Sequence, residues 1–418
     1  MSATPSDRGW TPPKQGVADT STGQAARSEV RVRAGAGGGT PGRVGMVGAG
    51  QLARMTYQAA VDLGIELEVL AAGRHDPAAQ VAAGVALGAP TDARALTALA
   101  DRCDVLTFDH ELVDLELLGR LEAAGHVLRP SPAALLAAVD KRHQRARLAA
   151  AGLPVPAARP AGDAAEVAAF AGEHGWPVVL KAARGGYDGR GVWVVDGPAP
   201  AAARVAAAGG RGVPLLVEAF VPIEREVAVL VARRPGGQAV VWDVVETVQQ
   251  EGICRELLAP ARVPGPLAAR ARSLGTRIAE LLGVVGLLAV ELFVAGDELL
   301  VNELAMRPHN SGHHTIEGAV TSQFGNHLRA VLDLPLGSTA ASAPAAATVN
   351  VLGGPDGADP RDRLRQALAV DGVRVHLYGK APRPGRKLGH VTALGGELDE
   401  ALARARAAAA ALVAPATA

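Results

Sequence analysis

The segment from Arg43 to Gly73, RVGMVGAGQLARMTYQAAVDLGIELEVLAAG, limits the fold of this chain more than any other stretch. It contains an apolar strand, a tight turn at Gly48 and Gly50, a helix and a second apolar strand. A helix that connects two such strands places them parallel in one sheet. The sequence therefore predicts an α/β fold that opens with a Rossmann-like domain.

The turn GAGQLA matches the G-x-G-x-x-A pattern of dinucleotide-binding proteins, although this pattern alone has low specificity. A nicotinamide enzyme needs an acidic residue at the end of the second strand to bind the ribose. Here that strand runs LEVLAAGR, and the first acid is Asp76. The missing acid disfavours a nicotinamide cofactor and leaves the turn free to bind another anion at the helix N-terminus.

Length and composition exclude several classes of protein. A chain of 418 residues is too long for one core, so about three domains are expected. The 42 basic and 42 acidic residues cancel and only 3% of residues are aromatic, which disfavours nucleic acid and membrane partners. Cys103 and Cys254 form no disulfide framework, and residues 1–42 lack a signal peptide. We expect a cytoplasmic protein in which residues 1–42 are a disordered tail or the product of a start codon placed too early.

Lysine is rare in this chain, and its positions are informative. Of the 42 basic residues, 37 are arginine and five are lysine. A chain that uses arginine so heavily is expected to keep lysine where a compact, movable ammonium is needed. The alternative is a composition bias without function. The five lysines are Lys14, Lys141, Lys181, Lys380 and Lys387.

The stretch KAARGGYDGRGVWV, residues 181–194, places four glycines between two apolar strands. It joins a strand to a strand, so it is not a P-loop. Glycine N–H groups in such a loop can fold over phosphates, and Lys181 at its base would add an ammonium. An ordinary flexible hairpin is the alternative. The chemistry of Tyr187, Asp188 and Arg190 in the same window favours a binding loop.

The stretch VELFVAGDELLVNEL predicts a β-hairpin with two facing carboxylates. A three-residue loop over 296–298 sets Glu291 directly opposite Glu303. Two facing carboxylates repel each other, and a divalent cation such as Mg²⁺ between them would remove the conflict. Asn302 is a further oxygen donor. Two exposed carboxylates on an edge strand are the alternative.

Two polar segments supply further candidates. The turn MRPHNSGHH carries Arg307, Asn310 and Ser311, and suits a loop that orients a polar substrate better than a zinc site. The segment YGKAPRPGRKLGH carries two of the five lysines, together with Arg383 and Arg386. A solvated basic patch is one interpretation, and capture of a substrate phosphate is the other.

With these motifs the chain resembles the ATP-grasp superfamily, and within it the family of 5-(carboxyamino)imidazole ribonucleotide synthases of purine biosynthesis. The resemblance covers roughly residues 43–392 and rests on GAGQLARM, GGYDGRG, NELAMRPHNSGHHTIEGAVTSQFGNHLRA and YGKAPRPGRKLGH. It implies an ATP-grasp fold in four parts after the tail. These are a Rossmann-like domain (43–130), a lid subdomain (131–205), a central domain with the metal and nucleotide site (206–345) and a small β-rich C-terminal domain (346–418).

The resemblance implies an ATP-dependent ligase that carboxylates 5-aminoimidazole ribonucleotide with bicarbonate. The reaction would pass through carboxyphosphate and release ADP and phosphate on the route to IMP. Mg²⁺ or Mn²⁺ would be the metal, held by Glu291 and Glu303, and a homodimer is expected. The residues expected to bind ATP are Lys141, Lys181, Gly186, Gly189, Gly191, Val192, Glu218, Val221, Glu226, Gln249, Asn302 and Glu303.

The resemblance also implies a catalytic set and a set that binds the second substrate. Asp188 is a candidate to manage the proton of the amine, with Tyr187, Arg190 and Arg307 beside it. The residues expected to line the substrate site are Gln51, Glu111, His309, Asn310, Ser311, Lys380, Arg386 and Lys387.

Three motifs depart from the family pattern, at four positions. Thr247 and Gln249 replace an asparagine and a histidine, Met306 replaces a proline, and Asp109 replaces a glutamate. Other functions remain as alternatives. These are another ATP-grasp ligase, such as the formate-dependent glycinamide ribonucleotide transformylase, a nicotinamide oxidoreductase, and an ATP-binding module without turnover.

Overall fold

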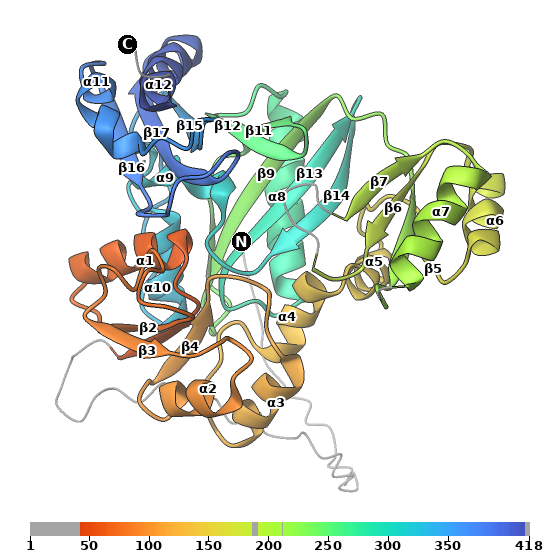
Figure 1. Ribbon diagram of the computed structural model, residues 1–418, viewed down its shortest axis with the longest axis horizontal. Helices are drawn as coiled ribbons and strands as arrows, with labels where there is room; N and C mark the ends of the chain where they lie inside the picture. Colours follow the sequence, from red (N-terminus) through yellow and green to blue (C-terminus); the bar gives the residue numbers. More distant parts are fainter. Residues whose placement is uncertain (1–41, 186–190, 211, 414–418) are drawn as a thin grey trace, which may run out of the picture. The chain divides into compact units, whose positions relative to one another are not determined.

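The computed structural model of the protein describes residues 42–185, 191–210 and 212–413 (Figure 1). The first domain contains a parallel sheet in the order β3-β2-β1-β4, as the βαβ pattern predicts. The sequence of HVLRPS, residues 126–131, predicts a further strand, but in the structure Leu128 forms an isolated bridge to Leu106. The elements are β1 (Val44–Val47), α1 (Gln51–Asp62), β2 (Leu67–Ala71), β3 (Gly84–Leu87), α2 (Ala93–Ala100), β4 (Val105–Phe108) and α3 (Leu115–Ala123).

The glycine turn before α1 is filled by a side chain of the protein itself. The Gly50 N–H donates to the Asp109 carboxylate at 2.6 Å. Gly48 has a φ of +106°, and a Cβ atom there would lie 1.8 Å from Asp109 Oδ1. The sequence suggested an external anion at this helix N-terminus. The structure places an internal carboxylate there, so the turn has no space for a dinucleotide pyrophosphate.

One predicted helix is broken in two. The sequence between the N-cap residue Ser131 and Gly152 predicts one continuous helix, but Asp140 has extended backbone angles and separates two helices. Its carboxylate caps the second helix at the Arg142 N–H and also binds the guanidinium groups of Arg142 and Arg184. Aspartate side chains that bind nearby backbone compete with helix continuation in this way. The two helices are α4 (Pro132–Val139) and α5 (Lys141–Ala150).

The lid contains a separate antiparallel sheet in the order β5-β8-β6-β7. Phe170 and Val167 from one helix pack with Ala201 from another against its apolar face. The predicted boundary at residue 205 falls inside α7, and the strand after that helix still belongs to the lid sheet. The elements are β5 (Ala158–Ala161), α6 (Ala164–His174), β6 (Val178–Ala182), β7 (Val192–Val195), α7 (Pro198–Gly209) and β8 (Leu215–Ala219).

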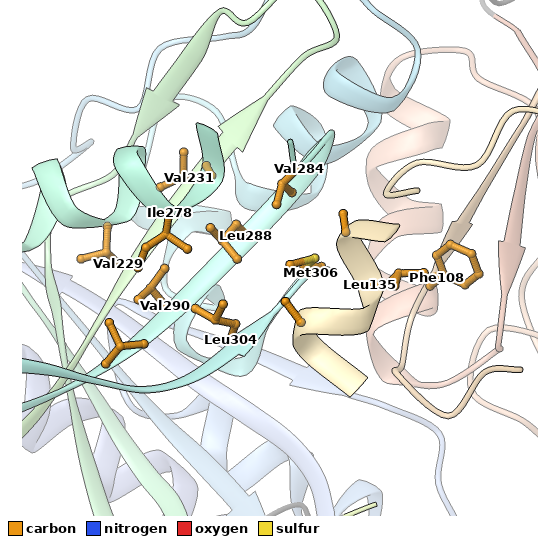
Figure 2. Packing of buried hydrophobic residues seen from close by; sticks show 14 of the residues in the cluster. Phe108, Leu135, Val229, Val231, Ile278, Val284, Leu288, Val290, Leu304 and Met306 are labelled. Carbon is orange, nitrogen blue, oxygen red and sulfur yellow. The ribbon is translucent and has the colours of Figure 1, made fainter. Parts of the chain in front are cut away.

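The largest sheet has nine strands, with antiparallel neighbours in the order β14-β13-β9-β11-β12-β15-β17-β16 and β10 paired to β9. Figure 2 shows its core, where Ile278 packs against Val229 and Val290. The elements are β9 (Arg225–Arg233), β10 (Ala239–Val241), β11 (Val245–Gln250), β12 (Ile253–Ala259), α8 (Gly265–Leu281), β13 (Gly286–Ala295), β14 (Glu298–Ala305), β15 (Ala345–Leu352), β16 (Val373–Leu377) and β17 (Lys387–Gly395).

The C-terminal segment is continuous with this sheet, because β12 pairs with β15. The long helix α12 packs on β15 and β17 through Ala405 and Leu412. Among the described residues, no helix combines the length and the apolar character needed to cross a membrane. The remaining elements are η1 (Asn310–Gly312), α9 (Thr315–Gly318), α10 (Gln323–Val331), η2 (Pro360–Arg363), α11 (Leu364–Leu368) and α12 (Leu398–Val413).

Candidate active site

A cavity of about 1160 Å³ collects nearly every predicted site residue that the structure describes. Gly191 is the exception, since it belongs to the described chain but is not part of the cavity wall. Gly186, Tyr187, Asp188, Gly189 and Arg190 lie outside the described residues. The predicted residues that line the cavity are Gln51, Glu111, Lys141, Lys181, Val192, Glu218, Val221, Glu226, Gln249, Glu291, Asn302, Glu303, Arg307, His309, Asn310, Ser311, Lys380, Arg386 and Lys387.

The hairpin of β13 and β14 brings the two predicted metal ligands together. Glu291 pairs directly with Glu303, as the sequence predicted. The predicted length of the hairpin loop was wrong, because the turn contains two residues, Gly296 and Asp297, rather than three. A β-bulge at Asn302 supplies the missing shift of one residue.

The bulge decides which way the side chains on β14 point. Leu299 and Val301 before it and Leu304 and Met306 after it all belong to the hydrophobic core shown in Figure 2. In a regular strand, side chains alternate between the two faces, so a single residue would separate two core residues such as Val301 and Leu304. The bulge places two residues between them. Because of the extra residue, Asn302 and Glu303 both reach the cavity.

Three carboxylates lie near one another on this face of the sheet. Burial, followed by the charges of Glu303 and Glu226, raises the pKa of Glu291 to about 8. On β9, Glu226 pairs with Phe293, which is two residues after Glu291 on β13. Burial raises the pKa of Glu226 as well. A divalent cation would stabilise the charged form of such a cluster.

The donor set fits Mg²⁺ bound together with a nucleotide. No cluster of three or more His, Cys, Asp or Glu side chains suited to a metal exists among the described residues. Mg²⁺ usually takes one or two protein carboxylates and completes its shell with phosphates and water. Glu291 and Glu303 provide two such carboxylates, and Asn302 adds a neutral oxygen beside them.

Lys181 enters the cavity from lid strand β6, held by two groups. Its ammonium donates to Glu218 at 2.7 Å and to Asn302 Oδ1 at 3.0 Å. Burial lowers the pKa of Lys181, although the Glu218 charge opposes this. Burial alone would raise the pKa of Glu218, but Arg145 and Lys181 outweigh it and the pKa is lowered. The Glu218 carboxylate is therefore ionised and engaged with two cations.

Arg145 is a residue of this network that the sequence analysis missed. It lies on α5 and donates to Glu218 at 2.7 Å and to the Asn302 carbonyl at 2.7 Å. Lys141, one turn earlier on the same helix, forms an ion pair with Glu303. The i,i+4 spacing of these two cations was the available signal, because it places both on one face of a helix.

The loop after β14 presents a neutral histidine to the metal ligands. Burial lowers the pKa of His309 to about 3, with Arg307 and Lys387 adding to the effect. The Ser311 N–H donates to His309 Nδ1, which leaves the proton on Nε2, 3.5 Å from Glu291. The buried Gln323 side chain bonds both the N–H and the carbonyl of His309 and fixes the loop.

Positive side chains gather on the part of the cavity formed by the β16–β17 loop, α1 and the loop after β4. Lys380 donates to Gln51 on α1 at 2.5 Å, and Arg307 pairs with Glu111 at 2.9 Å. Arg383, Arg386 and Lys387 line the same region. We call this the cation wall. It comprises Gln51, Glu111, Arg307, Lys380, Arg383, Arg386 and Lys387.

The rest of the charged lining forms a second region, which we call the carboxylate wall. Apolar side chains beside it, among them Val194 on β7, Phe220 after β8 and Phe293 on β13, suit a flat ring and were not predicted. Phe220 is 47% exposed. The carboxylate wall comprises Lys141, Lys181, Arg184, Glu218, Glu226, Glu291 and Glu303.

Comparisons with known proteins identify the class of protein to which the chain belongs. Three family models match consecutive parts of the chain. They are a ribonucleotide synthetase preATP-grasp domain over residues 42–139, an ATP-grasp domain over 146–324 and a phosphoribosylaminoimidazole carboxylase C-terminal domain over 346–404. The fold and the site thus define an ATP-grasp protein.

Similar proteins of known name show which ATP-grasp family this chain belongs to. The N5-carboxyaminoimidazole ribonucleotide synthase of Mycobacterium tuberculosis is 52% identical over 371 residues, 88% of this chain and 86% of that protein. The chain belongs to the family of N5-carboxyaminoimidazole ribonucleotide synthases. A crystal structure of the Thermus thermophilus synthetase matches with a TM-score of 0.80 and 38% identity, covering 89% and 98% of the two chains.

An Aspergillus clavatus synthase has been crystallised with ADP and 5-aminoimidazole ribonucleotide. It matches with a TM-score of 0.81 and 32% identity, covering 89% of this chain and 98% of that one.

Proposed function

We propose that this chain uses ATP and bicarbonate to carboxylate the exocyclic amine of 5-aminoimidazole ribonucleotide, in purine biosynthesis. The observation that carries the proposal is one cavity lined by both the Glu291–Glu303 pair and the cation wall. The first suits a metal–nucleotide complex, and the second suits a phosphorylated substrate. A Thermus synthetase and an Aspergillus synthase with this fold support the same assignment.

The carboxylate wall would serve the nucleotide. Lys181 and Lys141 are placed to bind its phosphates, and the apolar side chains around Phe220 offer a surface for the adenine ring. Mg²⁺ or Mn²⁺ held by Glu291 and Glu303 would neutralise charge on the γ-phosphoryl group. Glu218 is engaged with Lys181 and Arg145, so Glu226 is the better candidate to accept a hydrogen bond from the ribose.

The reaction would proceed in two transfers. A bicarbonate oxygen attacks the γ-phosphorus, ADP leaves, and carboxyphosphate forms in the cavity. The amine of the ribonucleotide then forms a bond to the carboxyl carbon, phosphate leaves, and the amine loses a proton. Lys380, Arg386 and Lys387 would bind the phosphate of the ribonucleotide.

Several roles rest on family resemblance alone. Asp188 as proton acceptor, with Tyr187 and Arg190, is a proposal for residues outside the described chain. A homodimer and a cytoplasmic location stay predictions. Light scattering at micromolar concentration distinguishes a dimer from a monomer.

The test is ADP release with ATP, bicarbonate and 5-aminoimidazole ribonucleotide, each omitted in turn. We expect ADP only when all three are present, with a carboxylated ribonucleotide formed in equal amount. ADP release that ignores the ribonucleotide would contradict the proposal. Use of formate in place of bicarbonate would instead indicate a transformylase.

A further inference from the structure

Arg145 is a buried cation in which each of the three guanidinium nitrogens donates a hydrogen bond, yet it is not among the described residues that line the cavity. Its side chain is 4% exposed. Nε donates to Glu218, Nη1 donates to Gln144 Oε1 at 2.8 Å, and Nη2 donates to the Asn302 carbonyl. A buried guanidinium is stable only when such partners replace water.

The two remote partners of Arg145 are the same two residues that hold Lys181. Glu218 gives one carboxylate oxygen to Arg145 and the other to Lys181. Asn302 gives its backbone carbonyl to Arg145 and its side-chain oxygen to Lys181. Lys181 therefore uses two of its three N–H donors on groups that Arg145 fixes from behind.

These contacts join three separate elements. Glu218 belongs to the lid sheet, Arg145 to α5, and Asn302 to the bulge of the central sheet. The bulge also sets the direction of Glu303, whose carboxylate pairs with Lys141 on the same helix as Arg145. Arg145 thus contacts both residues that hold Lys181, and one of them, Asn302, directly precedes the candidate metal ligand Glu303.

We propose that Arg145 is a positioning residue that fixes the Lys181 ammonium for the nucleotide phosphates by holding Glu218 and Asn302 together. Arg145 shares the charge of Glu218, so the carboxylate does not draw Lys181 away from the cavity. Without Arg145, Glu218 would be a buried carboxylate with Lys181 as its remaining cation partner among the described residues. The inference rests on the proposed use of ATP.

The experiment compares the binding of ADP with that of adenosine, by calorimetry on Arg145→Gln and the wild-type protein. We expect ADP to bind about 10- to 100-fold more weakly to the variant, because a charge-assisted contact to the phosphates is misplaced. Adenosine lacks phosphates, so its affinity should be unchanged. A purely structural role would lower stability and leave the ratio of the two affinities as it is.

Arg129→Gln is the matched control. Arg129 is also buried, donates to the Val331 carbonyl at 2.9 Å, and is not among the described cavity residues. This variant should have a lower free energy of unfolding than the wild-type protein, while the ratio of its affinities for ADP and adenosine should not change. If Arg145→Gln does not fold, Arg145→Lys serves in its place, with a smaller loss of ADP affinity expected.

A second variant tests the route of the effect. Glu218→Gln should weaken ADP binding as well, and the double variant with Arg145→Gln should be no weaker than the worse single variant. Equal ratios of ADP and adenosine affinity in wild type and both Arg145 variants would overturn the inference. Failure of the wild-type protein itself to bind ADP would instead overturn the proposed function.

Discussion

The carboxylate wall and the cation wall differ in how their charges are balanced. Among the described residues, the carboxylate wall has four glutamates against two lysines and one arginine. The cation wall has one glutamate against five lysines and arginines. An excess of carboxylates is relieved by a metal cation, whereas an excess of cations is relieved by an anionic substrate. One cavity thus contains two regions of opposite charge balance in a chain without net charge.

The largest expected effect belongs to the carboxylate wall. Glu303→Gln keeps the shape of the side chain but removes one charge from the proposed metal site. We expect kcat for ADP release to fall about a thousandfold, the upper range for losing one electrostatic contact to a transition state. Affinity for the ribonucleotide should not change. Glu298→Gln, an exposed position on the same strand, is the control. Full activity of Glu303→Gln would refute the metal role.

The next effect concerns the glycine turn near the cation wall. Gly48→Ala should lower the free energy of unfolding by about 2–4 kcal/mol, because the new Cβ would clash with Asp109 at a positive φ. Gly125→Ala is the matched control, since Gly125 has a similar φ of +97° with no atom within 4 Å, so this change should cost about 1 kcal/mol. Urea unfolding measures both values. Equal losses would show that Asp109 does not fill the turn, and that the turn could extend the anion site.

Lys387→Met tests the cation wall directly. We expect KM for 5-aminoimidazole ribonucleotide to rise about 10- to 100-fold, since a charge-assisted contact to its phosphate is lost. ADP affinity should stay the same. Arg374→Met, an exposed cation on β16, should leave both quantities unchanged. An equal loss of ADP affinity in Lys387→Met would mean that the two walls do not act separately.

The smallest expected effect is the pH dependence of divalent-cation binding, which concerns the carboxylate wall alone. The pKa of Glu291 is about 8 without a cation, so the carboxyl is protonated at neutral pH. A divalent cation binds the ionised form, so its affinity should fall as pH falls below 8, by about tenfold per unit. Calorimetry with Mn²⁺ in two buffers at pH 7 should report release of nearly one proton. No release would contradict the raised pKa.

Much of this site could be predicted from sequence because its residues come in short motifs. The hairpin, the lysines of the basic segment and the polar turn after β14 are local patterns, and the structure brings them to one cavity. The facing of Glu291 and Glu303 was predicted correctly from a wrong turn length. Two-residue turns with a bulge and three-residue turns give the same register at Glu303, so sequence spacing cannot distinguish them.

What sequence reasoning missed depends on contacts between distant segments. Arg145 reaches Glu218 across 73 positions and Asn302 across 157. Asp109 was noted only as a departure from a family pattern, although it fills the glycine turn 59 positions earlier. The break at Asp140 depends on Arg184 in the lid as well as on Arg142 beside it. Such pairings follow from tertiary packing, which no local pattern encodes.

The most direct test of the account is a crystal of the protein with ADP and Mn²⁺, measured at a wavelength where manganese scatters anomalously. The account predicts an anomalous peak within coordination distance of both Glu291 and Glu303, with the nucleotide phosphates completing the shell and Lys181 in contact with them. A peak at any other position, or a nucleotide bound at the glycine turn before α1, would contradict it.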